Sequence, residues 1–512
     1  MREKLAPIAS AVVLVGLAAW SFAERWDVLA SSPFPVGVDG YFYPIQVRSL
    51  LETGTLQYPA SPLAFWLMAP LAAATDPIVG AKLGAALFGA LIAFPSYGVG
   101  ARLGKSRGAG LVAAMLATRS AGSMYLSVEF VKNGLGLTLA MTALWLLLRA
   151  LDAPTRGRIA TLVVAVALAM LAHKMAAAIV LGIAIPATLV TLIGRGELRG
   201  RRLFYTLAGL GVGVLAAIVV GLVAPERFVS PHDLALAGEL FTTDASWTLP
   251  ALARGHELTL GYEALTAVGL ALLAAPVVRH RGGLRVVAWA GIALALVIGI
   301  PWLDVSDPQG LAFRLRLAAF VPLALCAAIV AGAALDFARR TFTGALVRRG
   351  GLAEPEQTAG WAEALAVAVV LGVLALRTPG TRSDGRVLAH PAMIAAAQAM
   401  TARIPSGETA IIPERHLAFM VAWYARTQIS IRPEPVPEAR RWRVMPLYFI
   451  GKDSELDRAL VASRARTDVP RPLGVHPLHP NGFVIVAEST WQAVLATLPE
   501  NVRERWARWR TI

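Results

Sequence analysis

Residues 159–193 read IATLVVAVALAMLAHKMAAAIVLGIAIPATLVTLI, two apolar runs separated only by His173 and Lys174. Each run can cross the hydrocarbon layer of a membrane as a helix, because a helix satisfies its own backbone hydrogen bonds there. Arginine-rich segments flank the pair, RALDAPTRGR (149–158) before it and GRGELRGRR (194–202) after it. The stretch therefore predicts a membrane-spanning helical hairpin with a short turn on one side and basic loops on the other.

The composition extends this prediction to the whole chain. Of its 512 residues, 56% are hydrophobic and only 16% are charged, and the mean hydropathy is +0.59. A soluble protein of this length needs more charge on its surface. The formal charge of +15 does not indicate nucleic acid, since Lys and Arg mark the cytoplasmic loops of such proteins. Cys326 is the only cysteine, which excludes an intrachain disulfide and a cysteine-based metal site.

We expect a mainly α polytopic membrane protein with about eleven transmembrane helices. The first of these helices resembles a signal peptide, but its continuous apolar run favours a retained anchor over a cleaved leader. The expected spans are 8–24, 79–100, 108–126, 134–150, 159–173, 175–193, 204–223, 264–278, 286–301, 317–335 and 360–376.

The charges of the loops orient these spans. With a cytoplasmic N-terminus, the cytoplasmic side receives the basic loops RLGKSR, RALDAPTRGR, GRGELRGRR, RHRGGLR and DFARRTFTGALVRRG. The opposite loops hold few Lys and Arg, as the positive-inside rule requires. We therefore expect a multi-pass protein of the plasma (inner) membrane whose polar chemistry lies on the extracytoplasmic, or periplasmic, face.

Two parts are expected from the change of composition along the chain. Residues 1–376 form the transmembrane domain, with a first outer loop at 25–78 that carries interfacial helices and a large outer loop at 225–263. Residues 377–512 hold more charge and proline, with the strand-like runs TAIIP, QISI and GFVIVAE between helical patterns. We predict a small extracytoplasmic α/β domain there.

Asp39 and Glu129 are the candidate catalytic carboxylates, both expected on the outer face. Asp39 lies in GVDGYFYPIQVRSLLETG (37–54), where it is either the N-cap of a helix or a general base or metal ligand. Glu129 lies in SVEFVKNGLGLTL (127–139), where it either pairs with Lys132 or joins Asp39 in one cavity.

Basic residues of the outer face are candidates for binding a phosphate group. Arg314 and Arg316 precede a span in FRLRLAAF, where they are either snorkelling anchors or bidentate phosphate ligands. His173 and Lys174 form the outer turn of the hairpin, and a lone histidine there is more often an interfacial residue than a ligand. Further positive charge could come from Lys82, Arg119, Lys132 and Lys174.

The outward Asp39 motif, followed by YPASPLAFWLMAPLAA (58–73), resembles the GT-C superfamily of polytopic glycosyltransferases. FRLRLAAFVPLALCAAIV resembles the arginine-then-helix element of that superfamily, and HLAFMVAWYARTQI (416–429) resembles the start of its extracytoplasmic domain. The first-loop Asp-Glu pair of the aminoarabinose-transferase and protein-mannosyltransferase branches is Asp39-Gly40 here. The oligosaccharyltransferase signature WWDYG is absent from the sequence, so protein N-glycosylation is not expected.

The resemblance implies transfer of a sugar from a polyprenyl-phosphate-linked donor to a glycan, lipid or protein acceptor. It implies Asp39 as base or as ligand, with Glu129, of a divalent cation such as Mg or Mn. The donor phosphate would be held by Arg314, Arg316, Lys132 and Lys174, and the substrate contacted by Tyr41, Tyr43 and His173. Membrane lipids are expected partners and nucleic acid is not.

Three other classes of protein stay open. A transporter or flippase of lipid-linked saccharides would place polar residues at mid-membrane and show repeats, whereas the charged candidates here gather at one surface. A polysaccharide polymerase or ligase shares the chemistry but usually has a large outer loop. A membrane scaffold would have no need of Asp39.

Overall fold

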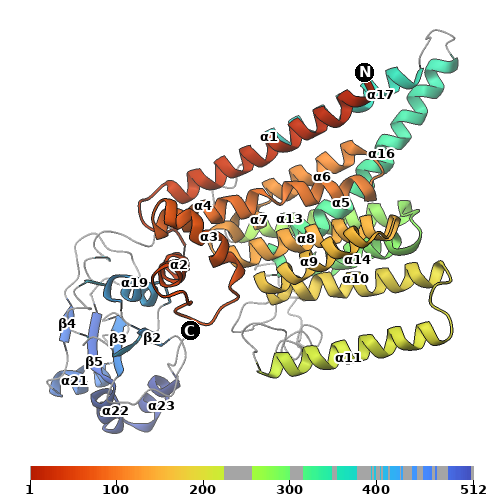
Figure 1. The fold of residues 1–512 in the computed structure, drawn as a ribbon. Helices are drawn as coiled ribbons and strands as arrows, with labels where there is room; N and C mark the ends of the chain where they lie inside the picture. The colour runs from red at the N-terminus through yellow and green to blue at the C-terminus, as the bar shows by residue number, and fades with distance from the viewer. Residues whose placement is uncertain are drawn as a thin grey trace. The chain divides into compact units, whose positions relative to one another are not determined.

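The computed structural model describes a mainly helical chain with one small sheet at its C-terminal end (Figure 1). The residues it describes are 2–37, 39–223, 256–299, 315–348, 355–377, 394, 397–398, 404, 408–412, 415–426, 428–430, 441–446, 454–463, 467–469 and 483–508. They confirm the expected class, a helical membrane protein with a C-terminal α/β region.

The chain divides into two compact units. The helical unit contains residues 1–28, 58–67 and 83–384, and the mixed unit contains residues 29–57, 68–82 and 385–512. Two segments of the expected first outer loop therefore belong with the C-terminal region, so the sequence boundary at residue 376 is not the only division of the chain.

In the helical unit, helices pack against their neighbours in the sequence and against helices that are more distant in the sequence. Its elements are α1 (Arg2–Ala30), α5 (Ala93–Leu103), α6 (Arg107–Arg119), α7 (Ala121–Val128), α8 (Val131–Asp152), α9 (Arg156–Ala172), α10 (Lys174–Gly194), α11 (Arg201–Val223), α13 (His256–Ala274), η2 (Ala275–Val277), α14 (Gly282–Gly299), α16 (Phe320–Arg348) and α17 (Pro355–Arg377). The closest pairings are α5 with α6, α8 with α9, α6 with α16, α13 with α16, and α10 with α14. Alanine, leucine and glycine fill the core between them.

Small residues allow these helices to approach closely. A Cβ at Gly98 would lie 2.4 Å from the indole nitrogen of Trp145, and one at Gly100 would lie 2.5 Å from the Cβ of Ala113. Glycine and alanine at such positions are typical of helix packing in membranes, where lipid is as apolar as the helix faces and close contact supplies the attraction.

Each of the eleven expected spans falls on a helix or on two consecutive helices. In the described residues, six segments are long and apolar enough to cross a membrane: Pro7–Ala30, Pro77–Leu103, Val131–Asp152, Lys174–Gly194, Gly282–Gly299 and Leu315–Thr341. The hairpin of the opening stretch is α9 and α10, and α9 has 17 residues. The run at 62–74 is α3 (Leu63–Ala74), of 12 residues, too short for a span as expected.

The basic loops meet at one end of the helical unit. Arg102 forms an ion pair with Asp152, and Arg195 donates to the carbonyl oxygen of Leu151. The backbone N–H of Gly283 donates to the Thr191 hydroxyl at 2.8 Å. Loops assigned to one side of the membrane from their charge are thus joined in space.

The mixed unit contains a five-stranded sheet in the described residues, in the order β2-β1-β3-β5-β4. Its strands are β1 (Thr409–Ile411), β2 (Gln428–Ser430), β3 (Arg441–Pro446), β4 (Thr467–Val469) and β5 (Phe483–Ala487). β1 is parallel to β2 and β3, and β5 is antiparallel to β3 and β4.

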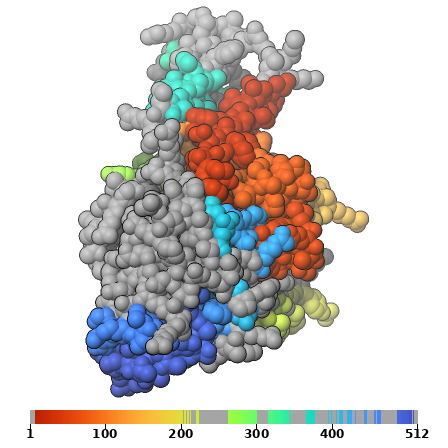
Figure 2. Space-filling model, turned by 90° about the vertical axis from the view of Figure 1, so that its left-hand side faces the viewer, coloured from red at the N-terminus to blue at the C-terminus, as the bar shows by residue number. Residues whose placement is uncertain are grey.

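Helices of the C-terminal segment pack together beside this sheet. They are α21 (Ser454–Ala462), α22 (Glu488–Ala496) and α23 (Glu500–Arg508), and they share a core that includes Leu456, Trp491 and Trp506. Figure 2 shows these segments in blue as one continuous piece of surface. Of the expected elements, TAIIP, QISI and GFVIVAE contain β1, β2 and β5, whereas HPAMIAAAQAMTARI lies largely outside the described residues.

The first outer loop supplies three helices. α2 (Phe42–Thr53) lies in the mixed unit, and α3 and α4 (Pro77–Ala90) each cross the boundary between the units. In the mixed unit α2 packs against α19 (Arg415–Ala425), with the rings of Phe42 and Phe419 5.1 Å apart. The expected large outer loop at 225–263 lies outside the described residues except for the start of α13.

Candidate functional site

Asp39 lies in a tight turn at the start of α2. The backbone N–H of Gly40 donates to the carbonyl oxygen of Gly37 at 3.2 Å, and that of Phe42 donates to the carbonyl oxygen of Asp39 at 2.9 Å. Gly37 has φ of 89°, in the left-handed region that favours glycine. The N-cap of α2 is Tyr41, so Asp39 precedes the cap by two residues and the reading of Asp39 as the N-cap is wrong. The Asp39 side chain is buried, with a relative exposure of 6%.

Gly40 is required by the path of this turn. A Cβ there would lie 2.7 Å from the carbonyl oxygen of Val36 and 3.0 Å from that of Gly37. Because both neighbours are backbone atoms, they cannot rotate away as a side chain would. The departure from the Asp-Glu pair therefore has a steric reason: in this turn no side chain fits after Asp39.

Tyr41 and Tyr43 anchor the turn in the mixed unit. The Tyr41 hydroxyl is 2.9 Å from that of Tyr424, and the two rings meet edge to face. Burial, and then the hydrogen bond with Tyr424, raise the pKa of Tyr41. Tyr43 is buried with its ring edge-on to Phe42. Both expected substrate-binding tyrosines thus pack and support the Asp39 turn, and contact with substrate stays a prediction.

Glu129 stands at the end of a short helix that is held at its other end by a second carboxylate. Glu129 is the C-cap of α7, where its N–H donates to the carbonyl oxygens of Tyr125 and Leu126. At the N-terminus of α7, Glu263 of α13 accepts from the Ser120 hydroxyl at 2.7 Å and from the Ala121 N–H at 2.6 Å. Negative charge at a helix N-terminus is stabilising. The sequence analysis missed Glu263, whose only signal was an acidic residue next to an apolar run.

A buried arginine holds the same helix along its side. Arg25 of α1 is fully buried, and its guanidinium donates to the hydroxyls of Ser127 at 3.0 Å and Ser123 at 2.8 Å. It also donates to the carbonyl oxygen of Thr118 at 3.1 Å. It donates as well to the carbonyl oxygen of Ser21 on its own helix at 3.1 Å. Arg25 thus joins α1 to the segment that leads to Glu129 by hydrogen bonds to neutral oxygens. Its partners Ser127 and Ser123 are 102 and 98 residues away in the chain, too far for a local sequence pattern to pair them with Arg25.

Arg119 and Lys82 are engaged in structural contacts. Arg119 pairs with Glu24 at 2.8 Å and lies 4.0 Å over the ring of Trp20. The ammonium of Lys82 donates to the Ser32 carbonyl oxygen at 2.6 Å. These contacts leave both cations serving the packing of the chain rather than a phosphate site.

Lys132, His173 and Lys174 share one corner of the helical unit. Lys132, in the first turn of α8, has its ammonium 6.0 Å from the ring centroid of Phe65. One turn further along α8, a Cβ at Gly136 would lie 3.0 Å from the Cβ of His173, so α8 touches the α9–α10 turn there. His173 is the N-cap of α10, and its Nδ1 accepts from the Met175 N–H at 3.2 Å. The lone histidine therefore caps a helix.

Arg316 lies beside the start of α7. A Cβ at Gly122 would be 2.2 Å from the carbonyl oxygen of Leu317, so the chain that carries Arg316 runs directly against α7. Arg316 is half-buried. Arg314 lies outside the described residues. Glu129, Lys132, His173, Lys174 and Arg316 thus all belong to the helical unit, at the end of α7, the start of α8, the α9–α10 turn and the segment beside the start of α7.

The expected divalent cation stays a prediction. No group of three or more His, Cys, Asp or Glu side chains lies close enough together there to hold a metal ion. Asp39 belongs to the mixed unit and Glu129 to the helical unit. No step below uses a metal.

The fold is that of the GT-C glycosyltransferases, which are membrane proteins. The chain is similar to ArnT from Cupriavidus metallidurans in its apo state, with a TM-score of 0.51 and 16% sequence identity over 94% of this chain and 98% of that one. It is also similar to the apo oligosaccharyltransferase of Archaeoglobus fulgidus, with a TM-score of 0.53 and 14% identity over 89% of this chain and 71% of that one.

The comparisons by sequence give no match. No family model matches the chain, and no curated protein matches it. The likeness is therefore one of fold alone, and in fold it agrees with the expected GT-C resemblance.

Proposed function

We propose that the chain is a membrane glycosyltransferase that moves a sugar from a polyprenyl-phosphate donor to an acceptor at the extracytoplasmic face. The observation that carries the proposal is the likeness in fold to ArnT over 94% of the chain, together with a buried aspartate in the turn before α2.

In the proposed reaction an acceptor hydroxyl attacks the anomeric carbon of the donor sugar. The new bond joins the acceptor oxygen to that carbon, and the bond from the carbon to the phosphate oxygen breaks. The hydroxyl proton passes to the Asp39 carboxylate, and polyprenyl phosphate leaves with the electron pair. A base held in position typically contributes 10²- to 10⁴-fold to such a step.

The leaving phosphate gains negative charge as its bond breaks, so cations placed beside it stabilise the transition state. We assign this role to Arg316, Lys132 and Lys174. Glu129 would bind or orient the acceptor, because α7 is fixed by Glu263 at one end and by Arg25 along its side. Preorganised groups are effective because they do not have to reorganise during the reaction.

The test is sugar transfer by the purified chain from a panel of polyprenyl-phosphate sugars, comparing wild type with Asp39→Asn. We expect the variant to bind donor as the wild type does and to lose at least 100-fold in transfer rate, since it retains shape but not basicity. Glu52→Gln is the matched control, because Glu52 is an exposed carboxylate of the same unit that pairs with Arg426 at 3.1 Å. Equal activity of Asp39→Asn and wild type would remove Asp39 from the chemistry.

A transporter of lipid-linked saccharides is the second candidate. In the described residues, the buried cation Arg25 and its serine partners form the kind of polar cluster that transporters also contain. Donor binding without sugar transfer to any acceptor, together with movement of donor between leaflets of a vesicle, would favour that class.

A further inference from the structure

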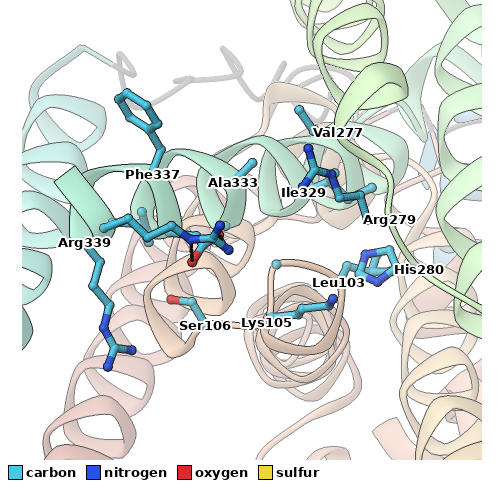
Figure 3. A pocket seen from close by; sticks show the side chains of 15 residues that line it. Leu103, Lys105, Ser106, Val277, Arg279, His280, Ile329, Ala333, Phe337 and Arg339 are labelled. Carbon is cyan, nitrogen blue, oxygen red and sulfur yellow. Dashed lines mark hydrogen bonds and ion pairs between the residues drawn. The ribbon is translucent and has the colours of Figure 1, made fainter. Parts of the chain in front are cut away.

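A polar cavity lies in the helical unit, where the basic loops meet. It has a volume of about 560 Å³ and lies between the α5–α6 turn, the loop after η2 and the middle of α16 (Figure 3). Its polar lining includes Lys105, Ser106, Arg279, His280, Arg339 and Arg340. None of these residues takes part in the proposed transfer reaction.

Two glycines determine the shape of this cavity. A Cβ at Gly332 of α16 would lie 2.1 Å from the carbonyl oxygen of Gly104, and a Cβ at Gly104 would lie 2.4 Å from the carbonyl oxygen of Ala328. Backbone therefore meets backbone between α16 and the α5–α6 turn. Lys105 follows directly in a left-handed conformation, with φ of 53°. This conformation is uncommon for a residue with a side chain, and it sets the position of the Lys105 ammonium.

The lining carries an excess of positive charge. Among the described residues that line the cavity, Asp336 is the one acidic residue, and it pairs with Arg340 at 2.6 Å. Lys105, Arg279 and Arg339 form no ion pair with another described residue. Like charges gathered without an acidic partner repel one another, and an anion in the cavity removes that repulsion.

His280 gives a second and independent indication of a ligand. Its side chain lines the cavity with a relative exposure of 8%, and its Nδ1 has no hydrogen-bond partner among the described residues. A buried polar atom without a partner costs free energy, which a ligand that completes the hydrogen bond recovers. Burial, and then the charge of Lys105, lower the pKa of His280, which favours the neutral ring.

Other basic residues at this end of the unit are already satisfied by the chain. Arg102 pairs with Asp152, Arg158 donates to the carbonyl oxygens of Arg149 and Ala153 at 3.1 Å and 3.0 Å, and Arg195 donates to Leu151. The positive-inside rule explains why basic residues are here, but it does not explain why three that form no ion pair within the described residues line a cavity with a buried histidine.

We propose that this cavity binds the phosphate group of an anionic phosphoester. Arginine and lysine are the usual ligands of such groups, and basic pockets between transmembrane helices on the cytoplasmic side bind anionic lipid headgroups. The same chemistry suits a lipid headgroup and a small phosphorylated solute, and the proposal holds whether or not the chain transfers sugar.

The test uses the full chain purified in detergent and two probes. Native mass spectrometry measures retention of phosphatidylglycerol against phosphatidylcholine, and thermal unfolding compares sodium phosphate with sodium chloride at equal ionic strength. The variant is Lys105→Gln/Arg279→Gln, and the control is Arg285→Gln, an exposed arginine of α14 that does not line the cavity. We expect wild type and control to bind at least one probe and the double variant to bind it at least tenfold more weakly.

The two probes distinguish a lipid headgroup from a soluble phosphoester as the source of the bound phosphate. Selective retention of phosphatidylglycerol identifies a lipid headgroup, and stabilisation by inorganic phosphate identifies a soluble phosphoester. Elution volume and circular dichroism establish that the double variant is folded, and Arg339→Gln on the exposed face of α16 replaces it if it is not. Binding of both probes unchanged by the variants, or no binding by the wild type, would overturn the proposal.

Discussion

At the scale of single residues, the turn around Asp39 depends on Gly40. We expect Gly40→Ala to lower the melting temperature and to reduce sugar transfer at least tenfold, because the added methyl group meets the backbone carbonyls of Val36 and Gly37. Overpacking of this kind costs about 1–3 kcal/mol. Gly16→Ala is the control, since a Cβ at Gly16 of α1 meets nothing within 4 Å. Unchanged melting and transfer in Gly40→Ala would show that the turn adapts.

A buried ion pair in the mixed unit predicts how stability depends on pH. Arg443 of β3 donates two hydrogen bonds to Glu488 of α22, at 2.9 Å and 2.7 Å. Burial alone would raise the pKa of Glu488, but the hydrogen bonds and charge of Arg443 outweigh it, so the pKa lies below its usual value. The pair therefore stabilises the fold fully above the ordinary glutamate range, and that stability is lost as pH falls through the lowered pKa.

Glu488→Gln should remove this dependence. We expect its melting temperature to be lower than that of wild type at pH 7, because Arg443 stays buried without its counter-charge, a loss of about 3–5 kcal/mol. The difference between the two proteins should shrink as pH falls below 4, where the wild-type carboxylate gains a proton. A constant difference from pH 7 to pH 3 would contradict this account. Glu500→Gln, at the start of α23, is the control.

Local sequence patterns could single out some residues of the candidate site, but they could not reveal contacts between residues that are far apart in the chain. Asp39 and Glu129 were singled out because the charges of the loops place both on the expected outer face, and their roles stay predictions. The partners Tyr41 and Tyr424, or Arg443 and Glu488, are 383 and 45 residues apart, and no local pattern pairs them. Their contacts arise only when the chain folds back on itself.

At the scale of elements, α7 depends on a carboxylate from another helix. We expect Glu263→Gln to lower the melting temperature by weakening the cap of α7, because an amide presents one acceptor oxygen where the carboxylate presents two. Leaving buried N–H groups unsatisfied costs about 1–3 kcal/mol. Sugar transfer should fall with it, since α7 ends at Glu129. Glu197→Gln, an exposed loop carboxylate, should change neither quantity, and equal behaviour of the two variants would count against the cap.

Helices and strands were predicted well where the periodic pattern of apolar residues is enough to define them. The opening hairpin is α9 and α10, and its turn is at His173, as the sequence indicated. β3 was missed because its Arg441 and Arg443 make the segment resemble a polar loop, although the Arg443 side chain is only 9% exposed beside Glu488. A charged residue that is buried with a distant partner gives no hydrophobic signal to a local pattern.

At the scale of the whole molecule, the distribution of charge predicts the orientation in the membrane. Arg102 with Asp152, Arg195 with Leu151 and Gly283 with Thr191 join basic loops at one end of the helical unit. The sequence assigned those loops to one side from their arginines and lysines alone. It could not show the regrouping of 29–57 and 68–82 with the C-terminal region, which depends on contacts such as Arg48 with the Trp423 carbonyl oxygen at 2.9 Å.

Cysteine labelling tests this orientation directly. Cys326 is fully buried, so the wild-type chain should react with a membrane-impermeant maleimide neither in intact nor in permeabilised cells. Glu52→Cys, on α2, should react in intact cells because the first loop is expected outside. Arg199→Cys, in the loop between α10 and α11, should react only after permeabilisation. The reverse pattern would place the Asp39 segment in the cytoplasm, where the donor and acceptor would have to be presented from the opposite leaflet, and would overturn the proposed extracytoplasmic reaction even if the fold and the role of Asp39 stand.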